Sequence, residues 1–151
     1  MAVTAFWYAK AFVNAFTRAK AIDYDTNAIK TALTTSAYTP NQDTHEAFSD
    51  VTNEVTGTGY TAGGQALTTK TLTNTNNVVA LDADDVTWAA STITARRAVV
   101  YDDSGTPSSN KALLFWVDFG ADFISSSGAF TIQWAAAGLA TITAADATGF
   151  P

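Results

Sequence analysis

The residues most suggestive of chemistry are three aspartates within four positions, Asp82, Asp84 and Asp85, followed by Trp88. Clustered carboxylates can ligate a cation, and two carboxylates can share the acid and base roles of a glycosidase while a tryptophan stacks on the sugar. The spacing excludes an EF-hand, because valine and threonine stand where that loop needs its third oxygen ligand and its glycine, and no glutamate follows.

Catalytic carboxylates generally project from separate strands, so that they face each other across a substrate. Neighbouring aspartates are instead typical of turns, where their side chains bond to the nearby backbone. The apolar alternation on either side of residues 82–85 predicts a hairpin corner between two strands. Asp82, Asp84 and Asp85 therefore remain only weak candidates for binding a metal.

Arg96 and Arg97 are adjacent in an otherwise apolar segment. Neighbouring side chains of a strand point to opposite faces, so one arginine must face inward or toward a neighbouring element. A guanidinium in that position is expected to meet a carboxylate bidentately. Asp118 or one of the acids at 82–85 could be this partner, within the chain or across a subunit contact.

His45 is the only histidine. A nucleophilic triad built on it needs an activated serine or threonine, and the sequence has no G-x-S-x-G elbow. The glycine-rich stretch GTGYTAGG has no lysine and does not match a phosphate-binding P-loop. We therefore expect His45 to be a solvated or capping residue, and we expect no catalytic residue, no cofactor and no enzymatic activity.

The four tryptophans lie in apolar segments, and the alternation around them favours packing in the core. Carbohydrate stacking is the alternative for any that is exposed. They are Trp7, Trp88, Trp116 and Trp134.

Composition narrows the class of protein. The formal net charge is −6, which argues against binding nucleic acid or an anionic membrane surface. The sequence has no cysteine, and its start lacks the basic region of a secretory signal. Charged residues make up only 15% of the chain, against an average of about 25%. Such a low charge suits a protein that packs against copies of itself or against a partner.

Two segments favour helix. In segment 5–20 the apolar residues Ala5, Ala9, Phe12, Phe16 and Ala19 recur near the helical period, and the alanines favour a helix over the strand that the same segment also permits. A short helix is expected near 44–51, with Thr44 as its cap.

The rest of the chain favours strands separated by turns. Strands are expected at 29–36, 66–73, 78–82, 86–90, 92–102, 112–120, 130–135 and 138–144, with turns at 74–77 and at the serines 125–127. A β-bulge at the two arginines would restore one apolar face to segment 92–102. The pattern predicts a mainly β fold, an antiparallel β-sandwich or barrel-like domain.

The domain organisation follows from the same pattern. One domain spans 1–151, made of an N-terminal arm or helix (1–20), a β-rich core (21–144) and an extended C-terminal tail (145–151).

Several motifs resemble a family of small structural proteins of tailed-bacteriophage virions. They are D-x-D-x-x-I-K-x-x-L, YTPNQDTH and GTGYxxGG within 21–67, and DADDVTW with TITAR within 81–103. Together these blocks cover roughly half of the chain. The family has an aromatic residue after the first arginine, where this sequence has Arg97.

This resemblance implies a virion component that is made in the cytoplasm of the host bacterium and has no enzymatic site. A small, acidic, β-rich chain favours a capsid cement or decoration protein that binds the major capsid protein on the capsid surface, as a homotrimer. A tail or neck structural protein and a carbohydrate- or receptor-binding module on the virion are the alternatives.

Overall fold

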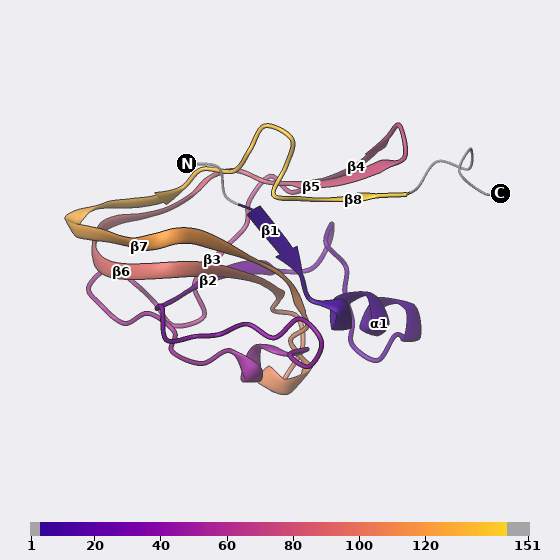
Figure 1. Ribbon diagram of the computed structural model, residues 1–151, viewed down its shortest axis with the longest axis horizontal. Helices are drawn as coiled ribbons and strands as arrows, with labels where there is room; N and C mark the ends of the chain where they lie inside the picture. The colour runs from indigo at the N-terminus through magenta and orange to yellow at the C-terminus, as the bar shows by residue number, and fades with distance from the viewer. Residues whose placement is uncertain (1–3, 145–151) are drawn as a thin grey trace.

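A computed structural model describes residues 4–144, and in it the chain forms two antiparallel sheets and a single α-helix (Figure 1). Strands hold 49% of the residues and helices 11%, so the expected mainly β fold is confirmed. The strands are β1 (Thr4–Trp7), β2 (Ile29–Thr34), β3 (Gln65–Ala66), β4 (Thr71–Thr75), β5 (Val78–Asp82), β6 (Val86–Asp102), β7 (Leu113–Ile132) and β8 (Ala140–Thr143). The helix is α1 (Ala9–Thr17), and two short 3-10 turns are η1 (Phe48–Asp50) and η2 (Ser108–Asn110).

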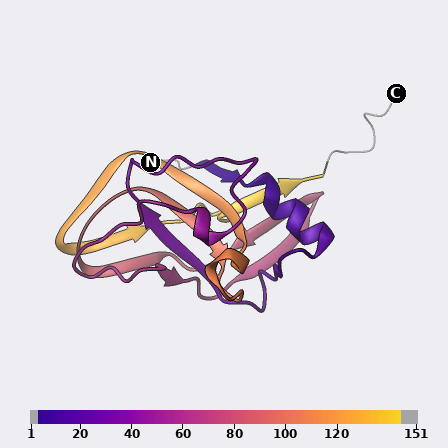
Figure 2. The same ribbon diagram turned by 90° about the horizontal axis from the view of Figure 1, so that it is seen from below.

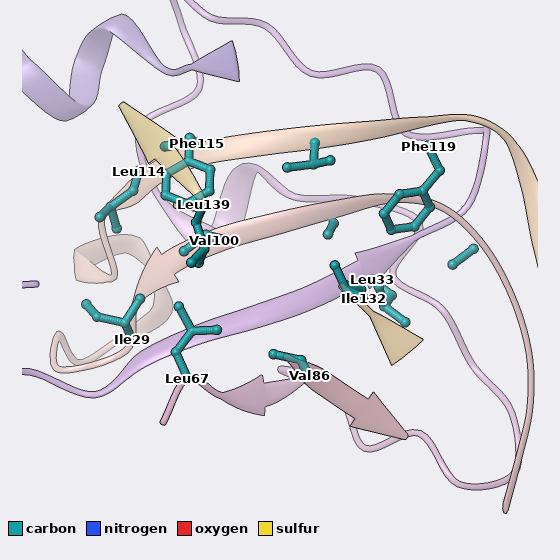
Figure 3. Close-up of a cluster of buried hydrophobic side chains, with 14 of the residues drawn as sticks. Ile29, Leu33, Leu67, Val86, Val100, Leu114, Phe115, Phe119, Ile132 and Leu139 are labelled. Atoms are coloured by element: carbon teal, nitrogen blue, oxygen red, sulfur yellow. The ribbon is translucent and has the colours of Figure 1, made fainter. Parts of the chain in front are cut away.

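The larger sheet has the order β1-β7-β6-β2-β3, and the smaller one has the order β4-β5-β8. Both sheets keep two free edges among the described strands, so the arrangement is sandwich-like and does not close into a barrel. Apolar side chains from both sheets meet in one cluster. Ile29, Leu33 and Val100 come from the larger sheet, and Leu139 comes from the approach to β8 (Figure 3). Leu81 of β5 belongs to the same cluster, which we call the main core.

Two long strands, β6 and β7, form the spine of the fold and pair along almost their whole length. Both bend sharply at one end of the molecule, where Ala90 and Ser127 adopt positive φ. Inside this bend the Ser91 hydroxyl lies 2.7 Å from the Ser125 hydroxyl. The expected hairpin loop at 125–127 is therefore wrong. The serines lie within β7, because local polarity cannot distinguish a loop from a bent strand whose polar groups bond to the neighbouring strand.

A second cluster covers the opposite face of the larger sheet. Tyr8, Tyr38 and Tyr101 are fully buried there with aliphatic residues of β2, β6 and β7, beneath the long connection from β2 to β3. The Tyr8 and Tyr38 hydroxyls lie 2.9 Å apart, so the buried phenols bond to each other. The larger sheet is thus covered on both faces.

The N-terminal segment differs from the continuous helix expected over 5–20. Residues 4–7 form β1, which pairs with β7, and the helix occupies only Ala9–Thr17. The expected apolar stripe also faces the wrong way. Ala11 and Asn14 are buried, whereas the Phe16 side chain is 86% exposed. Residues 5–7 pair with β7 and are therefore not part of the helix.

The strands expected at 86–90 and 92–102 are one strand, β6, and those expected at 112–120 and 130–135 both fall in β7. The strand expected at 66–73 is two strands, β3 and β4, and the helix expected near 44–51 is only the 3-10 turn η1. Asn76 and Asn77 form a two-residue turn with positive φ at both positions, the geometry that suits a tight antiparallel hairpin. The tail expected at 145–151 lies outside the described residues.

Candidate functional site

The three clustered aspartates lie at the connection between β5 and β6, which belong to different sheets. β5 pairs with β4 and β8, whereas β6 pairs with β7 and β2. The hairpin corner expected at 82–85 is therefore wrong, and the chain crosses from the small sheet to the large one here. Turn residues allow the chain to change direction, but they do not determine whether the two flanking strands pair with each other.

Asp84 fastens this crossover to the loop between β3 and β4. Its carboxylate accepts hydrogen bonds from the Thr68 and Thr69 hydroxyls, and its backbone N–H donates to the Thr68 carbonyl over 3.0 Å. Thr69 adopts positive φ, a strained conformation for a β-branched residue. The carboxylate thus holds a local bend in place.

Asp82 and Asp85 bond to two other segments. The Asp85 carboxylate accepts the Trp134 backbone N–H over 2.9 Å, and the Tyr24 hydroxyl donates to the Asp82 carbonyl over 2.8 Å. Within residues 4–144, no group of three carboxylates, histidines or cysteines is placed to hold a metal ion. The carboxylates of Asp84 and Asp85 and the backbone carbonyl of Asp82 thus tie four segments together at the junction of the sheets, which supports a structural role.

Arg96 and Arg97 both form ion pairs with Asp118. Arg96 Nε lies 2.7 Å from Asp118 Oδ1, and Arg97 Nε lies 3.1 Å from Asp118 Oδ2. Arg97 Nη1 also donates to the Tyr38 carbonyl over 2.7 Å, and its guanidinium carbon lies 5.9 Å from the centre of the Trp116 ring. The two arginines thus clamp one carboxylate of β7 between β6 and the loop after β2.

A register shift in the β6–β7 ladder makes this clamp possible. Ala95 pairs with Phe123, but Arg97 pairs with Asp118, so residues 119–122 of β7 bulge opposite Arg96. Ala95 and Ala98, which flank the arginines, both point into the main core. A break in pairing was expected at the two arginines and is found there, but the extra residues lie in β7 and not in segment 92–102. The break lets two adjacent side chains reach the same carboxylate.

Asp118 is held as an anion. Burial alone would raise the pKa of its carboxyl, but the Gly120 backbone N–H and the Arg96 and Arg97 guanidinium groups outweigh burial and lower that pKa. The Gly120 N–H donates to Asp118 Oδ1 over 2.7 Å. The Arg96 and Gly120 donors both reach Oδ1, and the Arg97 guanidinium lies beside Oδ2. These contacts within its own chain give the carboxylate a role in stabilising the fold.

The four tryptophans are all at least half-buried. Trp88 is 1% exposed in the main core, and Trp116 stacks on Phe6. Trp7 Nε1 donates to the Thr141 carbonyl of β8 over 3.2 Å, and Trp134 Nε1 donates to the Asp84 carbonyl over 3.1 Å. Trp7 thus joins the two sheets, and Trp134 bonds to the connection between them. A fully buried ring cannot stack on a sugar, which removes Trp88 from the carbohydrate alternative.

His45 lies in the loop before η1 and not at the start of a helix. Its Nδ1 is 3.0 Å from the Tyr38 hydroxyl, which in turn lies beside Tyr8. Burial raises the pKa of the Tyr8 and Tyr38 phenols, which keeps both rings neutral. His45 and the two phenols form a hydrogen-bonded chain that anchors the 39–45 loop to the second cluster.

Two surfaces stand out that the sequence pattern did not predict. One is the sheet of β4, β5 and β8, which we call the arm. Figure 1 shows the arm at the top right of the molecule. Its base is buried at Leu81 and Ala140, whereas every residue of β4 is exposed, with Leu72 53% exposed. In the strands of the arm only Asp82 is charged.

The other surface is a groove of about 360 Å³ between the two limbs of the bent β7. Phe119, Phe130 and Ile132 form its floor, and Phe123 and Ile124 at its rim are 41% and 72% exposed. Beyond Asp118, no described strand pairs with the outer edge of β7. Alternation along the strand predicts that these apolar residues face the core. The sequence carries no signal that the bend leaves this side of the sheet uncovered.

Comparison with protein-family models, with curated proteins and with solved structures gives no significant match. Within the described part of the chain, no helix has the length and apolar character needed to cross a membrane.

Proposed function

We propose that this protein is a capsid decoration protein of a tailed bacteriophage, which binds the major capsid protein on the outside of the head and holds adjacent capsomers together. The motif resemblance within 21–67 and 81–103 supports this proposal, and the projecting arm is the observation that carries it. A sheet with a fully exposed, uncharged outer strand is suited to packing against another protein.

The edges of the arm support a protein partner in particular. Free sheet edges in soluble proteins are usually protected by charged residues, prolines or bulges, because unpaired backbone groups attract other strands. The outer strand β4 reads TLTNT, and β8 on the other edge reads ATIT, so neither carries these protections. Contact with the capsid lattice would cover both edges, and many weak contacts repeated over a shell add up to high avidity.

The internal roles of the polar clusters support a structural protein over an enzyme. The acids at 82–85 and the Arg96–Asp118 pair bond to their own chain and link its segments. In the proposed mechanism these links keep the arm at a constant angle to the body. Self-association as a homotrimer would multiply the arms that reach neighbouring capsomers.

The test is co-sedimentation of the purified protein with empty mature capsids. We expect saturable binding at a copy number set by the lattice. Thr73→Lys, which places a charge in the middle of β4, is expected to weaken binding roughly tenfold or more. Thr52→Lys, on an exposed loop outside the arm, is the matched control and should bind like the wild type.

Two results would contradict the proposal. One is a protein that does not sediment with capsids, and the other is a virion that contains it at only a few to a few dozen copies. The second result would instead support the tail or neck alternative, because those assemblies contain few subunits.

A further inference from the structure

The helix α1 carries two exposed apolar side chains that nothing within the described structure covers. Val13 and Phe16 lie three residues apart, so they share one face of α1, and they are 48% and 86% exposed. Burying a side chain of this kind stabilises a contact, because it removes apolar surface from water. A phenylalanine that stands almost wholly in water on an ordered helix therefore marks a contact surface. We call these two residues the knob.

The groove between the limbs of β7 is the complementary shape. It is concave, its floor is aromatic and aliphatic, and at about 360 Å³ it has room for the phenyl and isopropyl groups of the knob. Two of its rim residues, Phe123 and Ile124, are themselves exposed.

Charge is complementary as well. Arg18 lies two residues after Phe16 of the knob, and Asp122 stands next to Phe123 at the groove. Both are exposed, and neither takes part in the ion pairs found within residues 4–144. Two knobs facing each other would bring arginine against arginine, and two grooves would leave an unfilled space. Only knob against groove satisfies both shape and charge.

The two surfaces lie at opposite ends of the molecule. In two perpendicular views α1 is at one end of the long axis, and the bend of β6 and β7 is at the other (Figures 1 and 2). A chain therefore cannot fill its own groove with its own knob. A second copy can, and a contact between two different surfaces of identical chains is head-to-tail and closes into a ring when the rotation between copies allows it.

We propose that this protein self-associates head-to-tail, with Val13 and Phe16 of one copy seated in the β7 groove of the next and Arg18 paired with Asp122 of that neighbour. This inference deepens the self-association in the proposed function and rests on it. It assigns the arm to the capsid, and the knob and groove to other copies of the chain.

The experiment measures molar mass in solution across a concentration series for Phe16→Asp and Ile124→Asp. Each change removes one of the two surfaces and leaves the other intact. The wild type is expected to form a discrete oligomer, and each variant alone is expected to be monomeric, with its affinity weakened roughly tenfold or more. An equimolar mixture should form a dimer and nothing larger, because it contains one intact knob and one intact groove per pair.

Charge exchange provides a second test that leaves the apolar residues in place. Arg18→Glu and Asp122→Arg should each weaken association, and the double variant should recover it. Far-ultraviolet circular dichroism and the melting temperature check that every variant is folded.

A monomeric wild type, an oligomer that survives Phe16→Asp, or a mixture that stays monomeric would each overturn the inference. Capsid binding by the wild type is scored separately in the sedimentation assay. If the protein binds capsids and these interface results are negative, the head-to-tail contact is wrong while the proposed function stands.

Discussion

The clamp of Arg96 and Arg97 on Asp118 leads to a prediction about stability. Asp118→Asn keeps the shape of the side chain and an oxygen that can accept the Gly120 N–H, but it removes the charge that both guanidinium groups face. The side chains of Arg96 and Arg97 are 28% and 16% exposed, so they are shielded from water without being fully buried.

The expected magnitude lies between two limits. Breaking a fully buried ion pair costs about 3–5 kcal/mol, and losing an exposed pair costs about 0.2–1 kcal/mol. For a partly shielded carboxylate that serves two arginines, we expect Asp118→Asn to lower the free energy of unfolding by about 2 kcal/mol. In a chain of this size that corresponds to a melting temperature lower by roughly 4–8 °C.

The assay is urea unfolding of both proteins at pH 7, pH 5 and pH 3. Because the pKa of Asp118 is lower in the folded state than in the unfolded one, its contribution is complete above the unfolded pKa of about 3.9. It is lost as the pH falls through the folded pKa. The difference between wild type and variant should therefore be the same at pH 7 and pH 5 and smaller at pH 3.

Asp25→Asn is the control, because Asp25 is exposed and belongs to none of the ion pairs within residues 4–144. It should change the free energy of unfolding by no more than about 0.5 kcal/mol. If Asp118→Asn has an effect as small as this control at pH 7, or an effect that does not diminish in acid, the charge of Asp118 does not stabilise the fold through its two arginines.

Three further outcomes follow from the structure. Trp88→Ala should lower the free energy of unfolding by about 3–5 kcal/mol in the same urea assay, because the ring is buried in the main core. Ala15→Pro, in the interior of α1, should lower the free energy of unfolding by about 3 kcal/mol or more. Ala9→Pro, at the first helical position, should lower it by only about 1 kcal/mol, the value of its lost backbone hydrogen bond. Equal losses of stability would contradict the observed start of the helix. Gly64→Ala should lower the melting temperature, with a loss of more than about 1 kcal/mol, since φ is positive and a Cβ would strike a backbone carbonyl of β2.

The contact of Arg96 and Arg97 with Asp118 shows how much of a site the local sequence pattern can predict. Two adjacent arginines in an apolar strand require a partner and a break in alternation, so the bulge and an acidic partner could both be expected from the sequence. The choice of Asp118 over the acids at 82–85 depended on which strand pairs with β6, and the register of β6 with β7 decided it.

The sequence by itself determined the class of the fold and the inward faces of its strands. Alternation predicted that Val86 and Trp88, like Phe130 and Ile132, lie in the core. Successive side chains of a strand point to opposite faces, so the face of each one follows from its position along the strand.

The tertiary structure decided which strands pair. It therefore also decided the conformation of the two segments that were expected to be turns between paired strands. Residues 82–85 join two sheets and residues 125–127 lie in a bent strand, because pairing depends on contacts between residues far apart in sequence. The same long-range pairing left Phe16 in solvent and the β7 groove open. These two surfaces follow from where β1 and β7 meet and from where β7 bends, which no local pattern encodes.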